Sequence, residues 1–524
     1  MRVYIEPKRL VITYMKNKAS HNRRIFKNSI MLFFRMLLVT CVTLYTSRVV
    51  LHNLGVDDYG IYNVVGGLVT MFAVISGSLS GAVGRFLTFE LGKGNNDKLK
   101  EVFCTSVTVQ FILSIIIIIL IETVAVWFLN NEMQIPKERL FASNCVLQFS
   151  LIAFVINLLS VPYNAAIIAH EKMSFFAFVS LFESIGKLLI AYMISTSSWD
   201  KLIYYSMLSV ILALIVRFIY VWFCRKSFSE CTYKISFNAN TFKEMFVFSG
   251  WNFIGVSSRI LRENGGSVLI NMFAGPVVNA ANGIAIQVTN AANQFVGSFT
   301  TAINPQITKT YAKGDLDSHF DLIVRGAKFT FLLMFLISLP LMLNTEFVLQ
   351  LWLKEVPNHT VLFVRLSLTY SLFESLSAPL VTSMLATGKI KNYQIIVGSV
   401  QLLNLPISYF LLLSGFIPEV VFIVAIALSL VSLLLRLYLL HRMIKFKMSN
   451  FVYKVILRIV CIVAFSVPSS IAISNYIDFN FNGFIISSSV CVLLSTLCIY
   501  FIGCDAEERA FLNAKANQLR QKIF

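Results

Sequence analysis

Charged residues are scarce in this chain of 524 residues, where they make up 13% of the sequence against 57% for hydrophobic residues. An average soluble domain has roughly 25% charged and roughly 45–50% apolar residues. So low a charge content excludes an ordinary water-soluble enzyme. The hydrophobic residues recur in blocks of about 20, the length that a helix needs to cross the hydrocarbon core of a bilayer. The composition therefore predicts an all-α integral membrane protein.

Several motifs of enzymes and metal proteins are also absent. The chain has no G-x-G-x-x-G, no phosphate-binding G-x-x-x-x-G-K and no H-E-x-x-H. Its six histidines lack the spacing of metal ligands. Its nine cysteines include no C-x-x-C pair and lie mostly in apolar blocks, which favours packing over redox chemistry. We therefore expect no catalytic residues, no metal and no cofactor, with H⁺ and Na⁺ left open as coupling ions.

The apolar blocks predict about fourteen membrane-spanning helices. They cover residues 26–48, 61–83, 102–129, 140–168, 175–195, 202–224, 244–272, 279–303, 322–343, 361–386, 393–413, 418–440, 451–473 and 483–503. An even number of spans puts both termini on one side of the membrane. Because both terminal segments are basic, we place them in the cytoplasm.

The formal net charge of +18 at first suggests an anionic partner. Most Lys and Arg residues, however, fall in alternate loops between the expected spans. The opposite loops hold only Lys137, Arg139, Lys201 and Lys354, with Arg48 near a helix end. The charge thus marks the cytoplasmic side of the membrane, and its dispersal over short loops argues against a nucleic-acid partner.

The chain contains an internal repeat at an offset of 220 residues, which aligns the first two spans with the seventh and eighth. Gly55 then meets Gly275, and the pair Lys93-Gly94 meets Lys313-Gly314. An offset of six spans preserves orientation, which favours parallel repeats, as in transporters with a site between two lobes. Chance matching of apolar segments is the alternative, but it accounts poorly for the paired Lys-Gly.

The repeat predicts two pseudo-symmetric six-helix lobes followed by two further helices. The expected parts are a cytoplasmic tail at 1–24, a first lobe at 25–224, a cytoplasmic linker at 225–241, a second lobe at 242–441, the additional helices at 450–504 and a cytoplasmic tail at 505–524. Every external loop is short, so the function is expected to lie within the membrane.

A few ionisable residues fall inside the expected spans, where each charge near a helix centre costs at least about 2.5–3.5 kcal/mol. Arg35 either lines a cavity or extends its long stem to the interface. Glu183 and Lys187 are one helical turn apart, so they either neutralise each other or leave Lys187 to contact a substrate. Together with Glu263 and Glu374, Glu183 is a candidate for proton or ion coupling.

The seventh and eighth spans are the most polar. The seventh carries Asn252, Arg259, Arg262 and Glu263; Arg259 and Glu263 can pair, which leaves Arg262 in excess. The eighth carries amides at helical spacing, namely Asn282, Gln287, Asn290, Asn293 and Gln294. This stripe predicts the wall of a water-filled cavity, and the alternative is interhelical hydrogen bonding between tightly packed small residues. Amides exchange hydrogen bonds with sugar hydroxyls, and Arg binds phosphate oxygens in pairs.

Short motifs at the start of each lobe suggest a family. The first lobe has Leu54, Gly55, Tyr59 and Gly60 after the first span and Arg85 after the second. The second lobe has SGWN at 249–252, GPVVNAA at 275–281 and NPQ at 304–306. These segments resemble the Wzx-type polysaccharide (O-antigen) flippases of the multidrug/oligosaccharidyl-lipid/polysaccharide exporter (MOP) superfamily. The sharp motifs are confined to the lobe starts, whereas the likeness in span count and lobe size covers the chain.

The resemblance implies a V-shaped, MATE-like carrier in the bacterial inner membrane. Such a carrier moves an undecaprenyl-pyrophosphate-linked oligosaccharide, the repeat unit of an O-antigen, capsule or exopolysaccharide, to the outer leaflet by alternating access. Its cationic cavity would involve Arg35, Lys187, Arg259 and Arg262, and membrane lipids and glycan-assembly proteins would be further partners. The alternatives are a MATE-like multidrug or small-solute exporter and, less favoured for want of a large outer loop, a polysaccharide polymerase or ligase.

Overall fold

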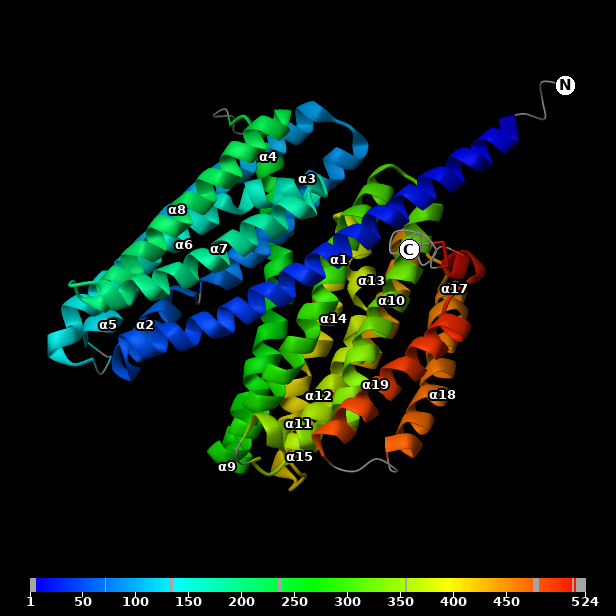
Figure 1. The fold of residues 1–524 in the computed structure, drawn as a ribbon. Coiled ribbons are helices and arrows are strands. Elements are labelled where there is room, and N and C mark those ends of the chain that lie inside the picture. The colour runs from blue at the N-terminus through cyan, green and yellow to red at the C-terminus, as the bar shows by residue number, and fades with distance from the viewer. Residues whose placement is uncertain are drawn as a thin grey trace, which may run out of the picture. The chain divides into compact units, whose positions relative to one another are not determined.

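The computed structural model describes residues 6–70, 72–131, 133, 135–233, 238–353, 356–474, 480–510 and 513–514. Throughout this part of the chain the secondary structure is helical, with no strand, which confirms the predicted all-α class (Figure 1). The predicted outer position of Lys354 and most of the predicted C-terminal tail lie outside the described residues.

Ten of the described helices are long and apolar enough to cross a membrane. They are Asn28–Leu54, Asn96–Asn131, Lys137–Ala169, Met173–Met193, Lys201–Ser227, Leu316–Leu343, Lys391–Leu413, Val420–Ile444, Met448–Ser474 and Phe481–Gly503. The helices Thr360–Ser375 and Ala378–Thr387, which meet at a bend of 40°, make an eleventh if they form one broken span.

The remaining predicted spans are helical within their described residues but fall short in length or hydropathy; they are 61–83, of which residue 71 lies outside the described residues, 244–272 and 279–303. The first corresponds to α2 (Val56–Thr70) and α3 (Ala73–Lys93), and the other two lie in α9 (Ala239–Ala312). Serine, glycine and amide side chains lower their hydropathy. The sequence predicted about fourteen spans, whereas ten or eleven helices are apolar enough to cross a membrane. The difference lies in the predicted spans that are richest in polar residues.

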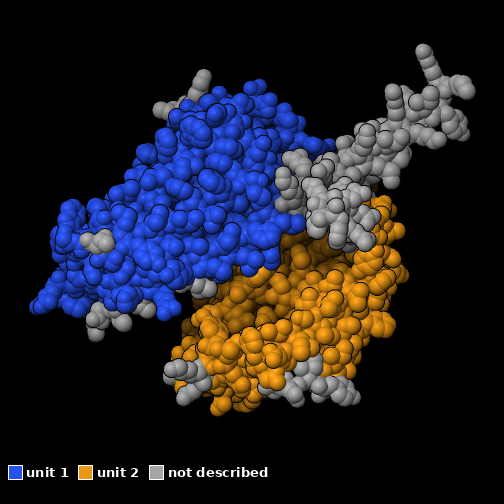
Figure 2. Space-filling model, in the orientation of Figure 1, with its two compact units in different colours: residues 1–257, 301–315 blue, residues 258–300, 316–524 orange. Residues whose placement is uncertain are grey.

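Contacts between helices divide the chain into two compact units (Figure 2). Unit 1 comprises Met1–Ser257 and Thr301–Asp315, and unit 2 comprises Ser258–Thr300 and Leu316–Phe524. The helix α9 therefore contributes its two ends to unit 1 and its middle to unit 2. The finer domain limits expected from the sequence stay predictions.

Unit 1 is built around α6, which packs against α2, α3, α4 and α8, while α1 packs along α7. Its further helices are α1 (Glu6–Leu54), α4 (Asn96–Leu120), α5 (Val126–Asn131), α6 (Leu140–Ala169), α7 (Met173–Met193) and α8 (Lys201–Ser227), with 3₁₀ turns at Lys137–Arg139, Ile194–Thr196 and Ser229–Cys231 and a π turn at Ile121–Ala125. Val65, Ile117, Val146 and Leu147 are fully buried where these helices meet.

Unit 2 is centred on α12, which packs against α10 and α16. Its helices, besides the middle of α9, are α10 (Leu316–Leu343), α11 (Thr345–Trp352), α12 (Thr360–Ser375), α13 (Ala378–Thr387), α14 (Lys391–Leu402), α15 (Asn404–Leu413), α16 (Val420–Ile444), α17 (Met448–Phe451), α18 (Leu457–Ser474) and α19 (Phe481–Cys498), with π turns at Val452–Ile456 and Ile499–Gly503. Ala281 and Ala285 of α9 join Met334, Phe363 and Leu368 in the buried core.

The repeated glycines adopt matching backbone conformations. Gly94 after α3 and Gly314 after α9 have φ of 74° and 75°, and Gly55 and Gly275 have φ of 82° and 84°. At Gly94 and Gly314 the glycine N–H donates to the carbonyl three residues earlier, and the next N–H donates to the carbonyl five residues before it. This helix ending needs a left-handed residue, which glycine adopts without strain. The matched geometry supports a true repeat over chance similarity.

The segment after α19 fixes the two C-terminal helices to α10. Lys328 of α10 is 1% exposed, and its Nζ donates to Glu508 Oε2 (2.6 Å) and to the carbonyl of Gly503 (3.0 Å). Arg458 of α18 pairs with Asp505 (2.5 Å). Burial raises the pKa of the Asp505 carboxyl, but the hydrogen bond from Arg458 and the charge of Lys328 together lower that pKa below its ordinary value.

Replacing Glu508 by Gln removes the charge that compensates the buried Lys328, and we expect the free energy of unfolding to fall by about 3–5 kcal/mol. The control is Glu507→Gln, since Glu507 pairs with Arg325 but its side chain is 61% exposed; we expect a loss of about 0–1 kcal/mol. Unfolding of the purified chain in detergent measures both, and equal losses would contradict the assigned role of Lys328.

Candidate functional site

The middle of α9 brings Arg262 into the interior of unit 2, where it is 7% exposed. Its Nη1 donates to the hydroxyl of Tyr370 on α12, and its guanidinium lies 4.6 Å from the centre of the Tyr370 ring. Its Nη2 lies 3.2 Å from Glu263 Oε1. The sequence suggested Arg259 as the partner of Glu263; the structure instead pairs Glu263 with Arg262 and leaves Arg259 exposed.

A second arginine lies near this group and was not singled out as a site residue from the sequence. Arg436 of α16 is 2% exposed and donates two hydrogen bonds to Glu374 of α12, at 2.9 and 3.2 Å. Glu374 also interacts electrostatically with Arg262 and Tyr370. Because the partners are 62 residues apart in sequence, helical spacing gives no signal for them.

We call Arg259, Arg262, Glu263, Glu374 and Arg436 the unit 2 charge cluster. Arg262 pairs with Glu263 and Arg436 with Glu374, so the exposed Arg259, one turn before Arg262, has no ion-pair partner among the described residues and leaves one positive charge in excess. Glu263 is 55% exposed and screens Arg262 weakly, whereas the guanidinium of Arg262 is buried. Because arginine stays protonated at physiological pH, the excess charge is permanent. The cluster can therefore bind an anionic group.

The amides of α9 divide into buried and exposed residues. Asn282 is buried, and its Nδ2 donates to Ser267 Oγ (2.8 Å). Gln287, Asn290, Asn293 and Gln294 are exposed, and of these Asn293 donates to Ser371 Oγ (3.4 Å). Gly275 breaks α9 between Ser267 and Asn282, so Asn282 bonds across the break from one helical segment to the other, as the packing alternative predicts. The exposed amides keep donors and acceptors for water or a ligand. Their role in substrate binding stays a prediction.

Unit 1 brings Arg35, Glu183 and Lys187 into one neighbourhood. Lys187 Nζ lies 2.7 Å from Glu183 Oε1, so the two side chains neutralise each other. The Arg35 guanidinium lies 4.4 Å from the centre of the Phe176 ring and interacts electrostatically with Glu183 and Tyr220. Its buried Nε has no hydrogen-bond partner among the described residues. The group contains two cations and one anion, so it also has one positive charge in excess.

Other groups in unit 1 were missed from the sequence. Arg217 of α8 donates to the carbonyl of Ile156 on α6 (3.3 Å), and the hydroxyls of Tyr45 and Tyr192 lie 2.8 Å apart. Lone polar residues in apolar helices are the signal that could have pointed to Arg217.

The predicted site residue Asn252 lies in unit 1, whereas Arg262 of the same predicted span lies in unit 2. The side chain of Asn252 donates to the carbonyl of Ser78 in unit 1 (3.1 Å).

The motif after the first span forms one end of unit 1. Leu54 ends α1, and Gly55 turns the chain into α2 with Tyr59 and Gly60 in its first turns. Asp58 of this turn pairs with Arg139, which in turn pairs with Asp200. Asp200 caps α8 by accepting hydrogen bonds from two backbone N–H groups. These ion pairs join the starts of α2, α6 and α8.

Arg85, the remaining motif residue, is surrounded by aromatic rings near the end of α3. Its guanidinium lies 4.5, 4.6 and 5.5 Å from the ring centres of Phe86, Phe89 and Phe248. Burial lowers the pKa of Arg85 to about 10, against the opposing charge of Glu90. The group therefore stays protonated at neutral pH and packs this part of unit 1 through cation–π contacts.

The end of α3 and the last part of α9 approach each other closely in unit 1. A Cβ on Gly92 would lie 2.8 Å from Ala312 Cβ and 3.0 Å from Lys309 Cα. Gly92 and Ala312 are 220 residues apart, so the contact joins equivalent positions of the two repeats. Nearby, Lys309 pairs with the buried Glu171 (2.6 Å), which also accepts a hydrogen bond from Gln306.

Comparison with known proteins identifies the fold. Residues 32–193 match the MatE family model. A structure of MATE in complex with MaD3S has a TM-score of 0.70 at 13% identity, over 81% of this chain and 97% of that one. An outward-facing multidrug resistance MATE family transporter of the MOP superfamily has a TM-score of 0.70 at 12% identity, over 80% and 95%. The chain has the fold of MATE transporters.

Two further proteins are similar to this chain. A MOP superfamily transporter from Pyrococcus furiosus, whose binding pocket is described as reversed in polarity, matches with a TM-score of 0.69 at 12% identity, over 81% of this chain and 96% of that one. EpsK of Bacillus subtilis, an uncharacterised membrane protein, is 18% identical over 282 residues, or 54% of this chain. The match spans 56% of the length of EpsK, little more than half.

The close contact between Gly92 of α3 and the last part of α9 can be tested by substitution. Adding a methyl group in Gly92→Ala forces α3 away from Ala312 and Lys309, and we expect a loss of about 1–3 kcal/mol in the free energy of unfolding. The control on the same helix is Gly84→Ala, because nothing lies within 4 Å of a Cβ placed there; it should be neutral or stabilising. Unfolding in detergent measures both, and a harmless Gly92→Ala would rule out the contact.

Proposed function

We propose that the protein is a MATE-fold transporter that moves an undecaprenyl-pyrophosphate-linked oligosaccharide from the inner to the outer leaflet by alternating access. It would lie in the bacterial inner membrane with both termini in the cytoplasm. Membrane lipids and glycan-assembly proteins would be its further partners, and it would catalyse no covalent reaction. The polyprenyl tail can remain in lipid, so the transporter needs to shield only the charged, hydroxylated head group from hydrocarbon.

The positive charge in excess within helices is the observation that carries this proposal. The unit 2 charge cluster holds three arginines against two glutamates, and Arg35 with Lys187 faces only Glu183 in unit 1. Arginine presents paired N–H donors that match phosphate oxygens. A pyrophosphate would supply the missing negative charge, whereas a cationic drug would meet repulsion.

The exposed amides of α9 support the sugar part of the proposed cargo. Gln287, Asn290 and Gln294 each offer a carbonyl acceptor and an NH₂ donor, and both can bond to hydroxyl groups. An uncharged amide replaces water around a sugar without adding charge to the transport path.

A second candidate, export of drugs or small solutes, has direct support from the comparisons. The similar solved structures include a multidrug resistance MATE family transporter, so the likenesses favour this candidate more closely than they favour lipid-linked glycans. Glu183, Glu263 and Glu374 would then serve as candidates for H⁺ or Na⁺ coupling. Against this candidate, each of the three carboxylates has a basic partner within the described helices.

Arg262→Gln tests the role of the excess charge in a cell whose surface glycan depends on this protein. Loss of one charge-assisted interaction is worth about 1.5–3 kcal/mol, so export should fall about ten- to hundredfold. The control is Arg442→Gln, since Arg442 is an exposed arginine at the end of α16. Normal surface glycan with an Arg259→Gln, Arg262→Gln double variant would refute the proposal, provided that membrane insertion is equal.

Cysteine labelling tests the proposed topology. In a chain freed of its native cysteines, an impermeant reagent added outside the cell should label a cysteine at Asn279 and not one at Lys313. The opposite pattern would invert the proposed orientation. Labelling of both after permeabilisation is the control for reactivity.

A further inference from the structure

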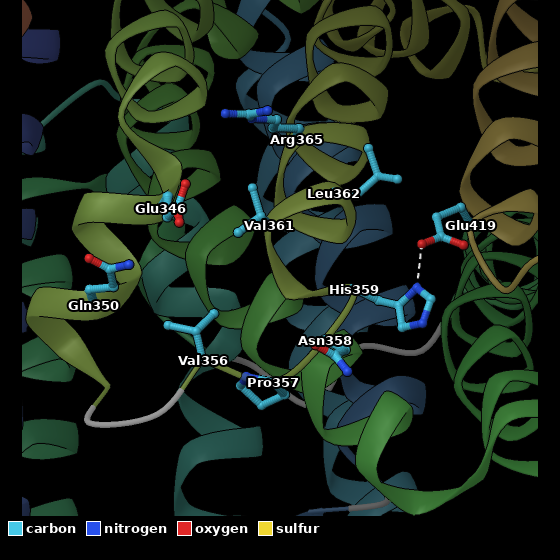
Figure 3. A pocket seen from close by; sticks show the side chains of 10 residues that line it. All are labelled: Glu346, Gln350, Val356, Pro357, Asn358, His359, Val361, Leu362, Arg365 and Glu419. Carbon is cyan, nitrogen blue, oxygen red and sulfur yellow. Dashed lines mark hydrogen bonds and ion pairs between the residues drawn. The ribbon is translucent and has the colours of Figure 1, made fainter.

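Unit 2 contains a cavity of about 780 Å³ at the ends of three helices (Figure 3). Glu346 and Gln350 of α11 line one side, and Arg365 of α12 lies farther along it. Asn358 and His359 come from the loop before α12, and Glu419 from the start of α16. The remaining lining residues are Val, Leu and Pro. Cavities of this size hold small organic ligands.

The equivalent place in unit 1 contains a permanent ion-pair network. Arg139 there binds Asp58 and Asp200. Adding 220 residues to Arg139 gives His359, and adding 219 to Asp200 gives Glu419, which pair with each other at 2.5 Å. The counterpart of Asp58 is Val278, so the second carboxylate is missing. In unit 2 the starts of α12 and α16 are therefore still joined by a side-chain pair. The arginine with two carboxylate partners is replaced there by His359, which has one and lies beside the cavity.

The backbone conformation of His359 and the incomplete hydrogen bonding of Glu419 are not explained by packing alone. His359 has a φ of 70°, a left-handed conformation that is costly for a residue other than glycine. Glu419 is 3% exposed, and its Oε2 has no hydrogen-bond partner among the described residues. A strained residue and an incompletely paired buried carboxylate at one cavity are typical of a binding site rather than of a structural helix end.

The charges of the lining indicate the class of ligand. The exposed charges of the lining are Glu346 and Arg365, which have opposite signs, whereas Glu419 is buried and hydrogen-bonded to His359. Gln350 and Asn358 add two uncharged amides. An electrically balanced lining gives no net attraction to a free anion or cation, whereas its mixed donors and acceptors suit a ligand with several hydroxyl groups.

We propose that this cavity of unit 2 binds an uncharged sugar ring of the transported glycan. This inference rests on the proposed function. It separates two tasks within unit 2: the charge cluster of α9, α12 and α16 receives the pyrophosphate, and the balanced cavity receives hydroxyl groups. His359 and Glu419 fix the start of α12 relative to α16 and so hold Asn358 and Arg365 at the cavity wall.

Calorimetric titration of the full chain in lipid nanodiscs tests this proposal. The probe is the free oligosaccharide released by mild acid from the lipid-linked glycan of the cell that carries the protein, and inorganic pyrophosphate is the comparison ligand. We expect the oligosaccharide to bind, and Gln350→Leu and Glu346→Leu each to weaken it about tenfold, as expected for one lost hydrogen bond of about 1–1.5 kcal/mol. The control is Asn130→Leu, which removes an exposed amide from α5 of unit 1.

His359→Gly separates binding from folding. Glycine adopts the left-handed conformation freely, and Glu419→Gln introduced with it removes the buried charge that loss of His359 would leave unpaired. Thermal unfolding of this double variant should therefore stay near the wild-type temperature. Loss of the imidazole should still weaken oligosaccharide binding at least about threefold, as expected when about 0.7 kcal/mol of positioning is lost. Wild-type affinity in this variant together with Gln350→Leu would overturn the proposal, as would the absence of oligosaccharide binding to the wild-type chain.

Surface glycan in the same cells distinguishes failure of this proposal from failure of the proposed function. Normal glycan export combined with oligosaccharide binding that ignores the cavity variants refutes the cavity and leaves the function in place. Cavity-dependent sugar binding in a cell whose glycan export does not require the protein refutes the function and leaves the cavity assignment in place.

Discussion

Arg436 and Glu374 hold each other inside unit 2 by two hydrogen bonds, at 2.9 and 3.2 Å. Neither group could remain charged alone among apolar helices, because desolvation of an unpaired ion costs several kcal/mol. Glu374 is thus paired with Arg436 and Glu263 with Arg262, so neither carboxylate of the cluster is left to pair with Arg259. The positive charge left in excess follows from these pairings, and it supports the proposal that the cargo has an anionic head group.

The two repeats share a backbone and differ in their polar contacts. The glycines at 55, 94, 275 and 314 keep the same left-handed conformations in both copies. At equivalent places, however, Arg217 donates to a backbone carbonyl where Arg436 donates to Glu374. Likewise, Arg139 has two carboxylate partners where His359 has one. Unit 1 therefore has the Arg139 ion pairs at the place where the cavity of unit 2 is lined by His359 and Glu419, and this difference supports the proposed sugar contact.

Local signals in the sequence predicted local structure well. The i,i+4 spacing of Glu183 and Lys187 indicated the pair that forms, and the repeated Lys-Gly indicated an internal repeat, whose two copies have matching glycine conformations. Contacts between distant segments had no such signal: Lys328 and Glu508 are 180 residues apart, and Arg262 and Tyr370 are 108 apart. Hydropathy also did not show that the ends of α9 belong to unit 1 and its middle to unit 2. The order of apolar and polar residues along a helix does not reveal which other helices it contacts.

The most direct test of an anionic, lipid-linked cargo is transport by the purified chain in proteoliposomes. Two assays on one preparation would measure transfer of a fluorescent undecaprenyl-pyrophosphate oligosaccharide between leaflets and export of a cationic dye. The account predicts transfer of the lipid-linked glycan above the rate in protein-free vesicles, and no dye export. Dye export coupled to an H⁺ or Na⁺ gradient, without glycan transfer, would contradict it.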